Sequence, residues 1–405
     1  MAGIKYWVWL SECKGLAGQT RLRLLDHFGT PENVYYADEE DYLHVEGMTR
    51  KLVSPLADKS MEAADAILGD CERLGLRILT MQDADYPVRL RNIYEPPCLL
   101  YVRGRLPVID EEAAIAMVGT RDATPYGLET AEALAYSMAK QGALIVSGAA
   151  SGVDSAAHRG ALRAGAKTVA VLGCGLDVVY PAGNGQLYQD ITAAGALLSE
   201  YPPGTAAIGA HFPVRNRIIS GLCLATVVVE APERSGALIT ARTALEQGRD
   251  VFAVPGAINA PKSRGCNRLI ADGAAALVAD SHDVLWEYEA SYPHKLHCAR
   301  VELPRTLGYQ ERKERETAKE AEQEQRERET RTAFDLEKDG ASLTDDQLCI
   351  LRTLRTGELQ VDDLIEAAGL PTRRVLSALT LLELEGYVAQ NGGKRFSLNV
   401  KLIGE

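Results

Sequence analysis

Two arginines flank an asparagine in the segment Arg215-Asn216-Arg217, directly before an apolar stretch that has the pattern of a helix. Neighbouring guanidinium groups bind phosphate oxygens through charge-assisted hydrogen bonds, and an amide adds further donors. The segment therefore predicts a phosphate-binding site. An alternative is that one of the two arginines pairs with a carboxylate at the end of a strand, such as Glu230.

Two glycine-rich segments could add backbone N–H groups to the same site. One begins at Gly119 and contains Arg121 and the pair Thr124-Pro125, which is typical of a helix N-cap and first turn. The other runs from Ser147 to Gly152 and also leads into a helix. N–H groups at the start of a helix are free to bind anions. The predicted contacts are Gly119, Thr120, Arg121, Ser147, Gly148, Gly152, Arg215, Asn216 and Arg217, with Ser235 and Gly236 as further candidates.

Groups that could perform covalent or acid–base catalysis are few. Asp154 and His158 are four residues apart in a predicted helix, so they could pair with each other or hold the loop before them. A structural role is the favoured interpretation of this histidine. The chain has no nucleophile next to an oriented base, no Walker-type loop and no well-placed GxGxxG. We therefore expect no catalytic residue, no metal and no cofactor, which indicates a binding protein and not an enzyme.

Short apolar and β-branched runs alternate with alanine-rich helical patterns between residues 76 and 295. Such strands predict a parallel sheet covered on both faces, and right-handed crossovers make it a doubly wound, Rossmann-like α/β fold. Ligands of these folds bind beyond the carboxyl ends of the strands, where the loops described above fall. The strands are predicted at Ala114–Val118, Ala143–Val146, Thr168–Leu172, from Leu197, at Ala225–Val229 and at Val251–Val254.

The part that precedes this domain, residues 1–75, predicts a small all-helical domain. Within it, Val45-Glu46-Gly47-Met48 resembles the turn of a helix–hairpin–helix motif, which could present N–H groups to a phosphate. An equal alternative is that this small domain only packs against the rest of the protein and binds no phosphate. Residues 302–340 are mostly charged and cannot bury an apolar face, so they predict a linker or a solvated helix.

The last part, residues 341–405, predicts three helices and a hairpin, which is the pattern of a winged helix. The second helix should end at Gly369, and Pro371 should open the third. Arg373 and Arg374 would begin the recognition helix and are further candidates for DNA contact. Protein docking is the alternative, because this part has nine acidic residues against seven basic ones.

The net charge of −12 over 405 residues argues against a protein that coats nucleic acid by bulk charge, although a local basic groove remains compatible with it. The eight cysteines include no two within four residues, so no CxxC pair exists. The N-terminal segment lacks the pattern of a signal peptide, and no apolar run has the length of a membrane span. We expect a cytoplasmic protein with reduced thiols and no membrane partner.

A series of motifs in chain order resembles the DNA-processing protein A family (DprA, also Smf). The resemblance spans about residues 80–280 and several independent segments. They are VGTRDATPYG at 118–127, SGAASGVDSAAHRGAL at 147–162, TVAVLGCGLDVVYPAGN at 168–184, LLSEYPPG at 197–204, FPVRNRIISGL at 212–222, VVVEAPERSGALITARTALEQGR at 227–249, VFAVPGAI at 251–258 and SRGCNRLIADGA at 263–274.

The resemblance implies a protein that binds single-stranded DNA without catalysing a reaction on it. Members protect incoming DNA during natural transformation and help load the RecA recombinase, typically as homodimers. The implied phosphate contacts fall on Arg121, on the Ser147–Gly152 loop and on Arg215-Asn216-Arg217. One departure concerns the basic residue that many members have soon after the Tyr-Pro pair, because here Ala182 and Gly183 follow Pro181. A neighbouring lysine or arginine would have to replace it.

Two rival functions come from other classes of protein. One is a Rossmann-like nucleotide phosphoribohydrolase, but the PGGxGTxxE signature of those enzymes is missing from the segment that begins at Glu230. The other is an oligomeric scaffold without a role in nucleic-acid binding. Release of free base from nucleotides would indicate the first, and retained partner binding without affinity for single strands would indicate the second.

Overall fold

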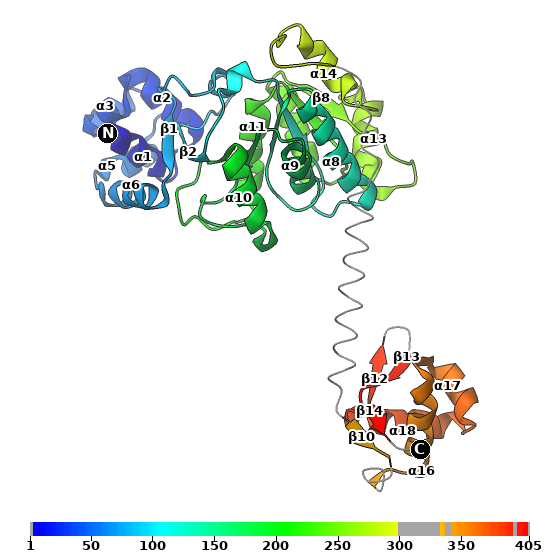
Figure 1. The fold of residues 1–405 in the computed structure, drawn as a ribbon. Helices are drawn as coiled ribbons and strands as arrows, with labels where there is room; N and C mark the ends of the chain where they lie inside the picture. The colour runs from blue at the N-terminus through cyan, green and yellow to red at the C-terminus, as the bar shows by residue number, and fades with distance from the viewer. Residues whose placement is uncertain (1–2, 299–332, 337–341, 392–394, 404–405) are drawn as a thin grey trace. The chain divides into compact units, whose positions relative to one another are not determined.

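The computed structural model of the chain describes residues 3–298, 333–336, 342–391 and 395–403. These residues form two compact units, Met1–Thr306 and Leu307–Glu405, each of which is described by itself (Figure 1). Most of the charged segment 302–340 lies outside the described residues. Within the described part of the chain, no helix combines the length and the apolar character that crossing a membrane would require.

A nine-stranded sheet forms the centre of the first unit, in the order β1-β2-β6-β5-β4-β3-β7-β8-β9. The strands from β6 to β9 are parallel to one another, whereas β2 runs antiparallel to both β1 and β6. The six predicted strands are all present. The bounds are Arg77–Thr80 (β1), Leu99–Gly104 (β2), Ala114–Val118 (β3), Leu144–Ser147 (β4), Thr168–Leu172 (β5), Ala196–Ser199 (β6), Ala225–Val228 (β7), Asp250–Ala253 (β8) and Ala276–Leu277 (β9).

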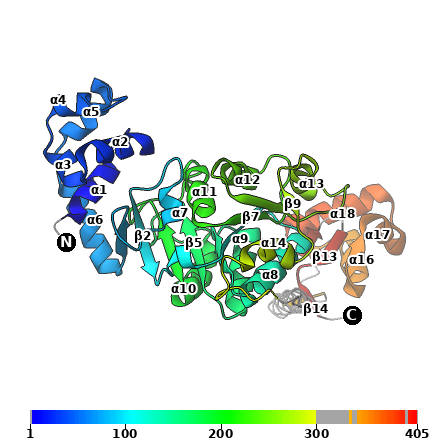
Figure 2. The same ribbon diagram turned by 90° about the horizontal axis from the view of Figure 1, so that it is seen from above.

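Helices cover both faces of this sheet, which confirms the doubly wound α/β fold. Buried residues of α11, α12 and α13 pack on one face, and those of α8, α9 and α14 pack on the other. Figure 2 shows α11, α12 and α13 in this order along the sheet. The bounds are Pro125–Lys140 (α8), Val153–Arg163 (α9), Gly185–Ala194 (α10), His211–Leu222 (α11), Gly236–Glu246 (α12), Arg264–Ala271 (α13) and His282–Glu289 (α14).

The sheet departs from the prediction at both edges, since β9 was not predicted at one edge and the other edge is mixed and not wholly parallel. Strands β1 and β2 were not predicted, and they extend the sheet beyond β6. Their outer position places the N-terminal helices against them, and Trp7 and Leu10 share one hydrophobic cluster with Tyr101 of β2 and Leu197 of β6. The short helix α7 (Val88–Arg91) lies between β1 and β2 in the chain.

The N-terminal part is helical, as predicted. The turn at Gly47 has a φ of +77°, and Arg23 Nη1 donates a hydrogen bond to the carbonyl oxygen of Glu46 over 3.2 Å. The guanidinium of Arg23 therefore covers this turn. The helices are Ile4–Glu12 (α1), Gly18–Phe28 (α2), Pro31–Tyr36 (α3), Glu39–Leu43 (α4), Arg50–Ala57 (α5) and Glu62–Leu74 (α6).

The second unit has the predicted winged-helix arrangement. Gly369 ends α17 in the left-handed conformation (φ +63°), and Pro371 precedes the first turn of α18. Residues 392–394 of the predicted hairpin lie outside the described residues. The elements are Ala333–Asp335 (β10), Asp345–Thr353 (α16), Leu359–Gln360 (β11), Val361–Ala368 (α17), Thr372–Leu384 (α18), Val388–Asn391 (β12), Arg395–Leu398 (β13) and Lys401–Ile403 (β14).

Candidate nucleic-acid interface

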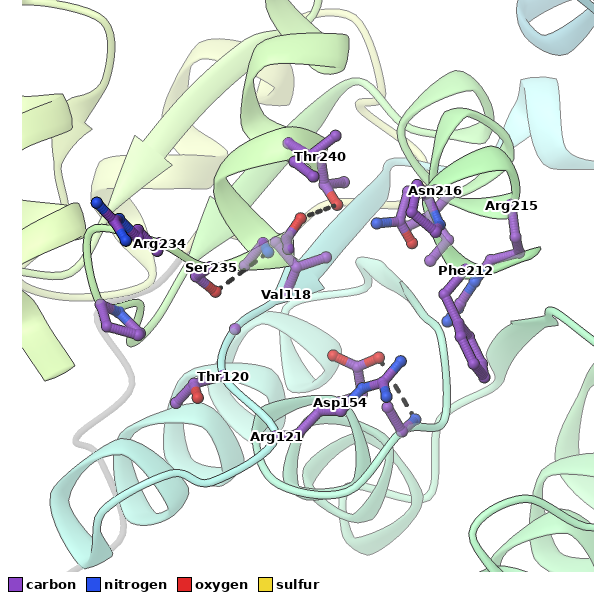
Figure 3. Close-up of a pocket in the computed structure, with 18 of the residues that line it drawn as sticks. Val118, Thr120, Arg121, Asp154, Phe212, Arg215, Asn216, Arg234, Ser235 and Thr240 are labelled. Atoms are coloured by element: carbon purple, nitrogen blue, oxygen red, sulfur yellow. Dashed lines mark hydrogen bonds between the residues drawn. The ribbon is translucent and has the colours of Figure 1, made fainter. Parts of the chain in front are cut away.

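The chain order of the strands reverses between β3 and β7, which are neighbours in the sheet although β4, β5 and β6 lie between them in sequence. A crevice opens at such a switch point because the loops on its two sides diverge. The loops that follow β3, β4 and β7, together with α11, line a pocket of about 390 Å³ at this place (Figure 3). We call it the basic pocket. Its polar and aromatic lining includes Thr120, Arg121, Asp154, Phe212, Arg215, Asn216, Arg234, Ser235 and Thr240.

Glu230, at the end of β7, fixes the loop that carries Arg121. Its carboxylate accepts hydrogen bonds from Thr124 N over 2.8 Å and from Thr124 Oγ1 over 2.7 Å. Its backbone oxygen accepts one from Thr120 N over 2.7 Å. Glu230 is only 1% exposed, and its oxygen atoms accept the hydrogen bonds described above. It therefore fixes the backbone of this loop and does not neutralise an arginine.

Gly119 and Gly152 let two loops approach each other closely. A Cβ on Gly119 would lie 2.4 Å from Val153 Cγ2, and one on Gly152 would lie 2.3 Å from the carbonyl oxygen of Thr120. Gly152 also has a φ of +78°, which favours glycine. These two predicted contacts thus shape the wall of the pocket by close packing of the backbone.

Arg215 places a buried positive charge at the pocket. The residue is 3% exposed, and Nη1 donates to the carbonyl oxygen of Val171 over 2.6 Å. Among the described residues, Arg215 Nε has no hydrogen-bond partner. A Cβ on Gly148 would lie 1.7 Å from Nη1, so this glycine provides the space that the guanidinium fills. Burial lowers the pKa of Arg215, and the Asp154 carboxylate opposes that shift.

Arg121 and Asn216 contribute the donors that are accessible from solvent. The exposed guanidinium of Arg121 lies 4.4 Å from the centre of the Phe212 ring, a cation–π distance. The amide of Asn216 lines the pocket. In Figure 3, Arg121 and Asp154 lie on one side of the pocket, and Phe212, Arg215 and Asn216 of α11 lie on the other. The arrangement offers cations, an amide and an aromatic ring to one ligand.

Asp154 is the carboxylate of the basic pocket. It is 7% exposed, and its Oδ2 accepts a hydrogen bond from Ala150 N over 3.4 Å, which holds the β4–α9 loop. Burial raises the pKa of Asp154, whereas the charge of Arg215 acts in the opposite direction. The carboxylate therefore balances part of the positive charge when no ligand is bound.

His158 does not pair with Asp154, and its role is structural. Thr168 Oγ1 donates to the carbonyl oxygen of Ile145 over 2.8 Å, so it must accept its 2.7 Å hydrogen bond from Nδ1–H of His158. The ring is fully buried and is neutral in the fold. Burial lowers the pKa of His158 to about 3.

This buried histidine predicts a loss of stability in mild acid. A histidine with a lowered pKa in the fold contributes its full stability above its unfolded pKa of about 6.5, and this stability is lost as the pH falls towards about 3. We expect a loss of about 2 kcal/mol between pH 6.5 and 4.5 from this group. Urea unfolding over this range should show a smaller loss for His158→Gln. Equal pH dependence in both proteins would contradict the prediction.

Two other predicted contacts are directed away from the basic pocket. Ser147 Oγ donates to the carbonyl oxygen of Met117 over 2.6 Å and is fully buried. Arg217 Nη2 binds both carboxylate oxygens of Glu200, over 2.7 and 2.8 Å. The expected alternative of a pair between an arginine and a strand-end carboxylate thus applies to Arg217, with Glu200 in place of Glu230. In the winged-helix unit, Arg374 Nε binds Asp346 over 2.7 Å, whereas Arg373 is exposed.

Sequence reasoning did not single out Arg234 or Phe212, both of which line the basic pocket. Arg234 directly precedes the candidates Ser235 and Gly236, so its position beside a predicted helix start was the available signal. Ser235 Oγ caps α12 by accepting from Ala237 N over 3.2 Å, and the space before Gly236 is open.

The loop after Tyr180-Pro181 adds no charge to the basic pocket. None of the residues 177–184 lines it among the described residues. The Asn184 amide is already bonded to the carbonyl oxygen of Ala149 over 3.0 Å and to Ser155 Oγ over 2.9 Å. The described residues also include no group of three or more side chains that could hold a metal ion.

Fold and pocket together define a class: a doubly wound α/β protein with an anion-binding pocket at the switch point and a winged-helix domain. Two family models match the chain. Residues 77–289 match DNA recombination-mediator protein A, and residues 335–394 match the DprA winged helix domain. The chain therefore belongs to the DNA recombination-mediator protein A (DprA/Smf) family.

Individual relatives agree with this assignment. The DNA processing protein DprA of Streptococcus pneumoniae is 39% identical over 288 residues, which cover 70% of this chain and 98% of that protein. Protein Smf of Synechocystis is 39% identical over 280 residues, covering 68% of this chain and 70% of its own length. The crystal structure of the S. pneumoniae protein matches with a TM-score of 0.62 and 38% identity, and covers 70% of this chain and 97% of that one.

Proposed function

We propose that the basic pocket binds single-stranded DNA and that the protein acts on DNA as a binding protein without catalysing a reaction. The observation that carries the proposal is the guanidinium of Arg215, which is buried, lines a solvent-accessible pocket and makes no ion pair among the described residues. A buried charge without an ion-pair partner is costly unless a ligand balances it. A phosphate group would do so.

Single strands fit this pocket better than a double helix does. Its volume of about 390 Å³ is in the range of small-ligand sites and suits one nucleotide unit. Reading a duplex requires an element that protrudes into a groove, and the basic pocket is recessed. Phe212 lines the pocket with Arg121 over its ring, and cations combined with aromatic side chains are typical of sequence-tolerant binding of single strands.

The relatives' names add the wider context of DNA processing and recombination. We propose on this basis that the chain protects incoming DNA during natural transformation, assists RecA loading, and works as a cytoplasmic homodimer. These partners remain predictions. In the winged-helix unit, the ion pair between Arg374 and Asp346 favours docking of a protein over contact with DNA, since it occupies one of the two candidate cations.

Titration with labelled oligo-dT at increasing salt tests the proposal. We expect tight binding at low salt, little preference between oligo-dT and oligo-dA, and a linear fall of log K with log salt. A blunt duplex of equal length is the comparison and should bind more weakly. Absence of affinity for single strands at low salt would refute the proposal, as would release of free base from nucleotides added as substrate.

A further inference from the structure

The loop after Tyr180-Pro181 supplies no cation to the basic pocket, so a strand that leaves this pocket needs another basic surface. Two directions are open along the carboxyl edge of the sheet. One leads over β5 and β6 towards the N-terminal helices, and the other leads over β7 and β8 towards α12 and α13 (Figure 2). The charges on the two sides differ.

The first direction ends at a second pocket of about 390 Å³ between the N-terminal helices and α11, which we call the acidic pocket. Three carboxylates line it: Glu12, Glu95 and Glu200. Both arginines that line it already have hydrogen-bond partners within the protein. Arg217 is paired with Glu200, and Arg21 donates to the carbonyl oxygens of Leu10 over 3.0 Å and Ser11 over 2.7 Å.

The carboxylates that line the acidic pocket would repel a phosphate group. Among the described residues, neither Glu12 nor Glu95 has a hydrogen-bonded partner for its carboxylate. Burial raises the pKa of Glu12, whereas the charges of Arg21 and Lys14 act in the opposite direction. A phosphodiester placed here would meet three carboxylates and two arginines, so the negative side chains that line the pocket outnumber the positive ones. A DNA strand is therefore disfavoured on this side.

The second direction offers arginines without such partners. Arg234 lies at the rim of the basic pocket, on the side away from Phe212 (Figure 3), and it is exposed. Arg264 begins α13 and is exposed as well. Neither guanidinium has a hydrogen bond or ion pair within the described ranges. Glu233, beside Arg234 in the chain, is the nearby exposed carboxylate.

Close backbone packing brings together the two chain segments that carry these arginines. Gly265 N donates to the carbonyl oxygen of Ala231 over 2.8 Å, and a Cβ on Gly265 would lie 2.8 Å from the carbonyl oxygen of Pro232. The first turn of α13 therefore rests on the segment that leads to Arg234. The acid of the neighbouring loop, Asp122, is neutralised because Lys262 Nζ binds its carboxylate over 2.7 Å.

We propose that the DNA strand leaves the basic pocket across the first turns of α12 and α13, where Arg234 and then Arg264 bind successive phosphates in place of the cation missing after Tyr180-Pro181. The proposal rests on the proposed function, because it extends the path of the same ligand. Arg215, buried at the inner end, and the two exposed arginines at the outer end define the basic path.

The test measures the affinity of the full chain for oligo-dT by fluorescence anisotropy at several salt concentrations. Arg234→Ala and Arg264→Ala should each lower the affinity for a strand of about 20 nucleotides several-fold and reduce the salt slope by about 0.7. Arg242→Ala is the matched control, since Arg242 is an exposed arginine of α12 that does not line the basic pocket. It should bind like the unchanged protein.

Two further experiments distinguish binding along this path from attraction by the overall charge of the protein. With a dinucleotide, which the basic pocket and its rim accommodate and which is too short to reach α13, Arg264→Ala should have no effect. Glu95→Gln should not change the affinity for the long strand, because that strand does not approach the acidic pocket. Increased affinity in this variant would overturn the proposed direction.

The outcomes distinguish this inference from the proposed function. If the unchanged protein fails to bind oligo-dT, both the proposed function and the proposed path are wrong. If the unchanged protein binds and Arg121→Ala weakens binding, but Arg234→Ala and Arg264→Ala match Arg242→Ala, only the path is wrong.

Discussion

Arg215→Met should reduce the affinity for single-stranded DNA by about 10- to 100-fold. Hydrogen bonds to charged groups contribute roughly 1.5–3 kcal/mol, and the buried guanidinium of Arg215 lines the basic pocket, where little solvent screens its charge. Methionine retains most of the volume of the side chain and removes the charge. Oligo-dT titration at fixed salt measures the effect.

The same substitution should lower the free energy of unfolding by roughly 1–3 kcal/mol, because it leaves the Val171 carbonyl oxygen and the buried Asp154 without their cationic neighbour. Urea unfolding would measure this loss separately from binding. A folded Arg215→Met protein with unchanged DNA affinity would show that Arg215 serves the fold alone.

Two further variants separate the charge from the fold. Gly148→Ala keeps the guanidinium but places a Cβ 1.7 Å from Nη1, so it should displace Arg215 and weaken binding as well. Asp154→Asn removes the negative charge from the basic pocket and retains an oxygen for Ala150 N. Its affinity for DNA should rise or stay equal. Weakened binding in Asp154→Asn at unchanged stability would contradict the anion-site interpretation of the pocket.

The parallel part of the sheet was predictable because its strands are short, continuous apolar runs between alanine-rich helices. Ala114–Val118 and Thr168–Leu172 have the predicted bounds. Strands β1 and β2 escaped prediction because they pair antiparallel at an edge, and no local pattern marks that pairing. Tyr101 of β2 packs in one hydrophobic cluster with the N-terminal helices, and local sequence does not show such a long-range contact.

The segments that form the candidate site were predictable from the sequence, whereas the directions of their side chains were less so. Arg215, Asn216 and Arg217 are consecutive, but successive residues of a helix point about 100° apart. The sequence therefore indicated three polar groups at one place, and α11 sends Arg217 to Glu200 instead. The role of Gly148 likewise depends on a side chain far along the chain, that of Arg215, which fills the space above it. Local spacing carries no information on such pairs.

Arg121→Ala should also weaken binding to single strands, by about tenfold. It should reduce the slope of log K against log salt by about 0.7, because one phosphate is then no longer neutralised by the protein. Arg121 differs from Arg215 in being exposed on a loop that Glu230 fixes, so its removal should leave the free energy of unfolding within about 0.5 kcal/mol. The same titration and urea unfolding measure the two effects.

The partner of Arg121 in the fold, Phe212, refines this expectation. The guanidinium lies 4.4 Å from the ring centre, so Arg121→Lys keeps the charge but loses planar stacking on Phe212. This variant should restore the salt slope and only part of the affinity. The same affinity for Arg121→Lys and Arg121→Ala would mean that stacking matters and charge does not. Because the net charge of the chain is −12, binding has to depend on a few focused cations, and the removal of Arg121 from the basic pocket should be visible at every strand length.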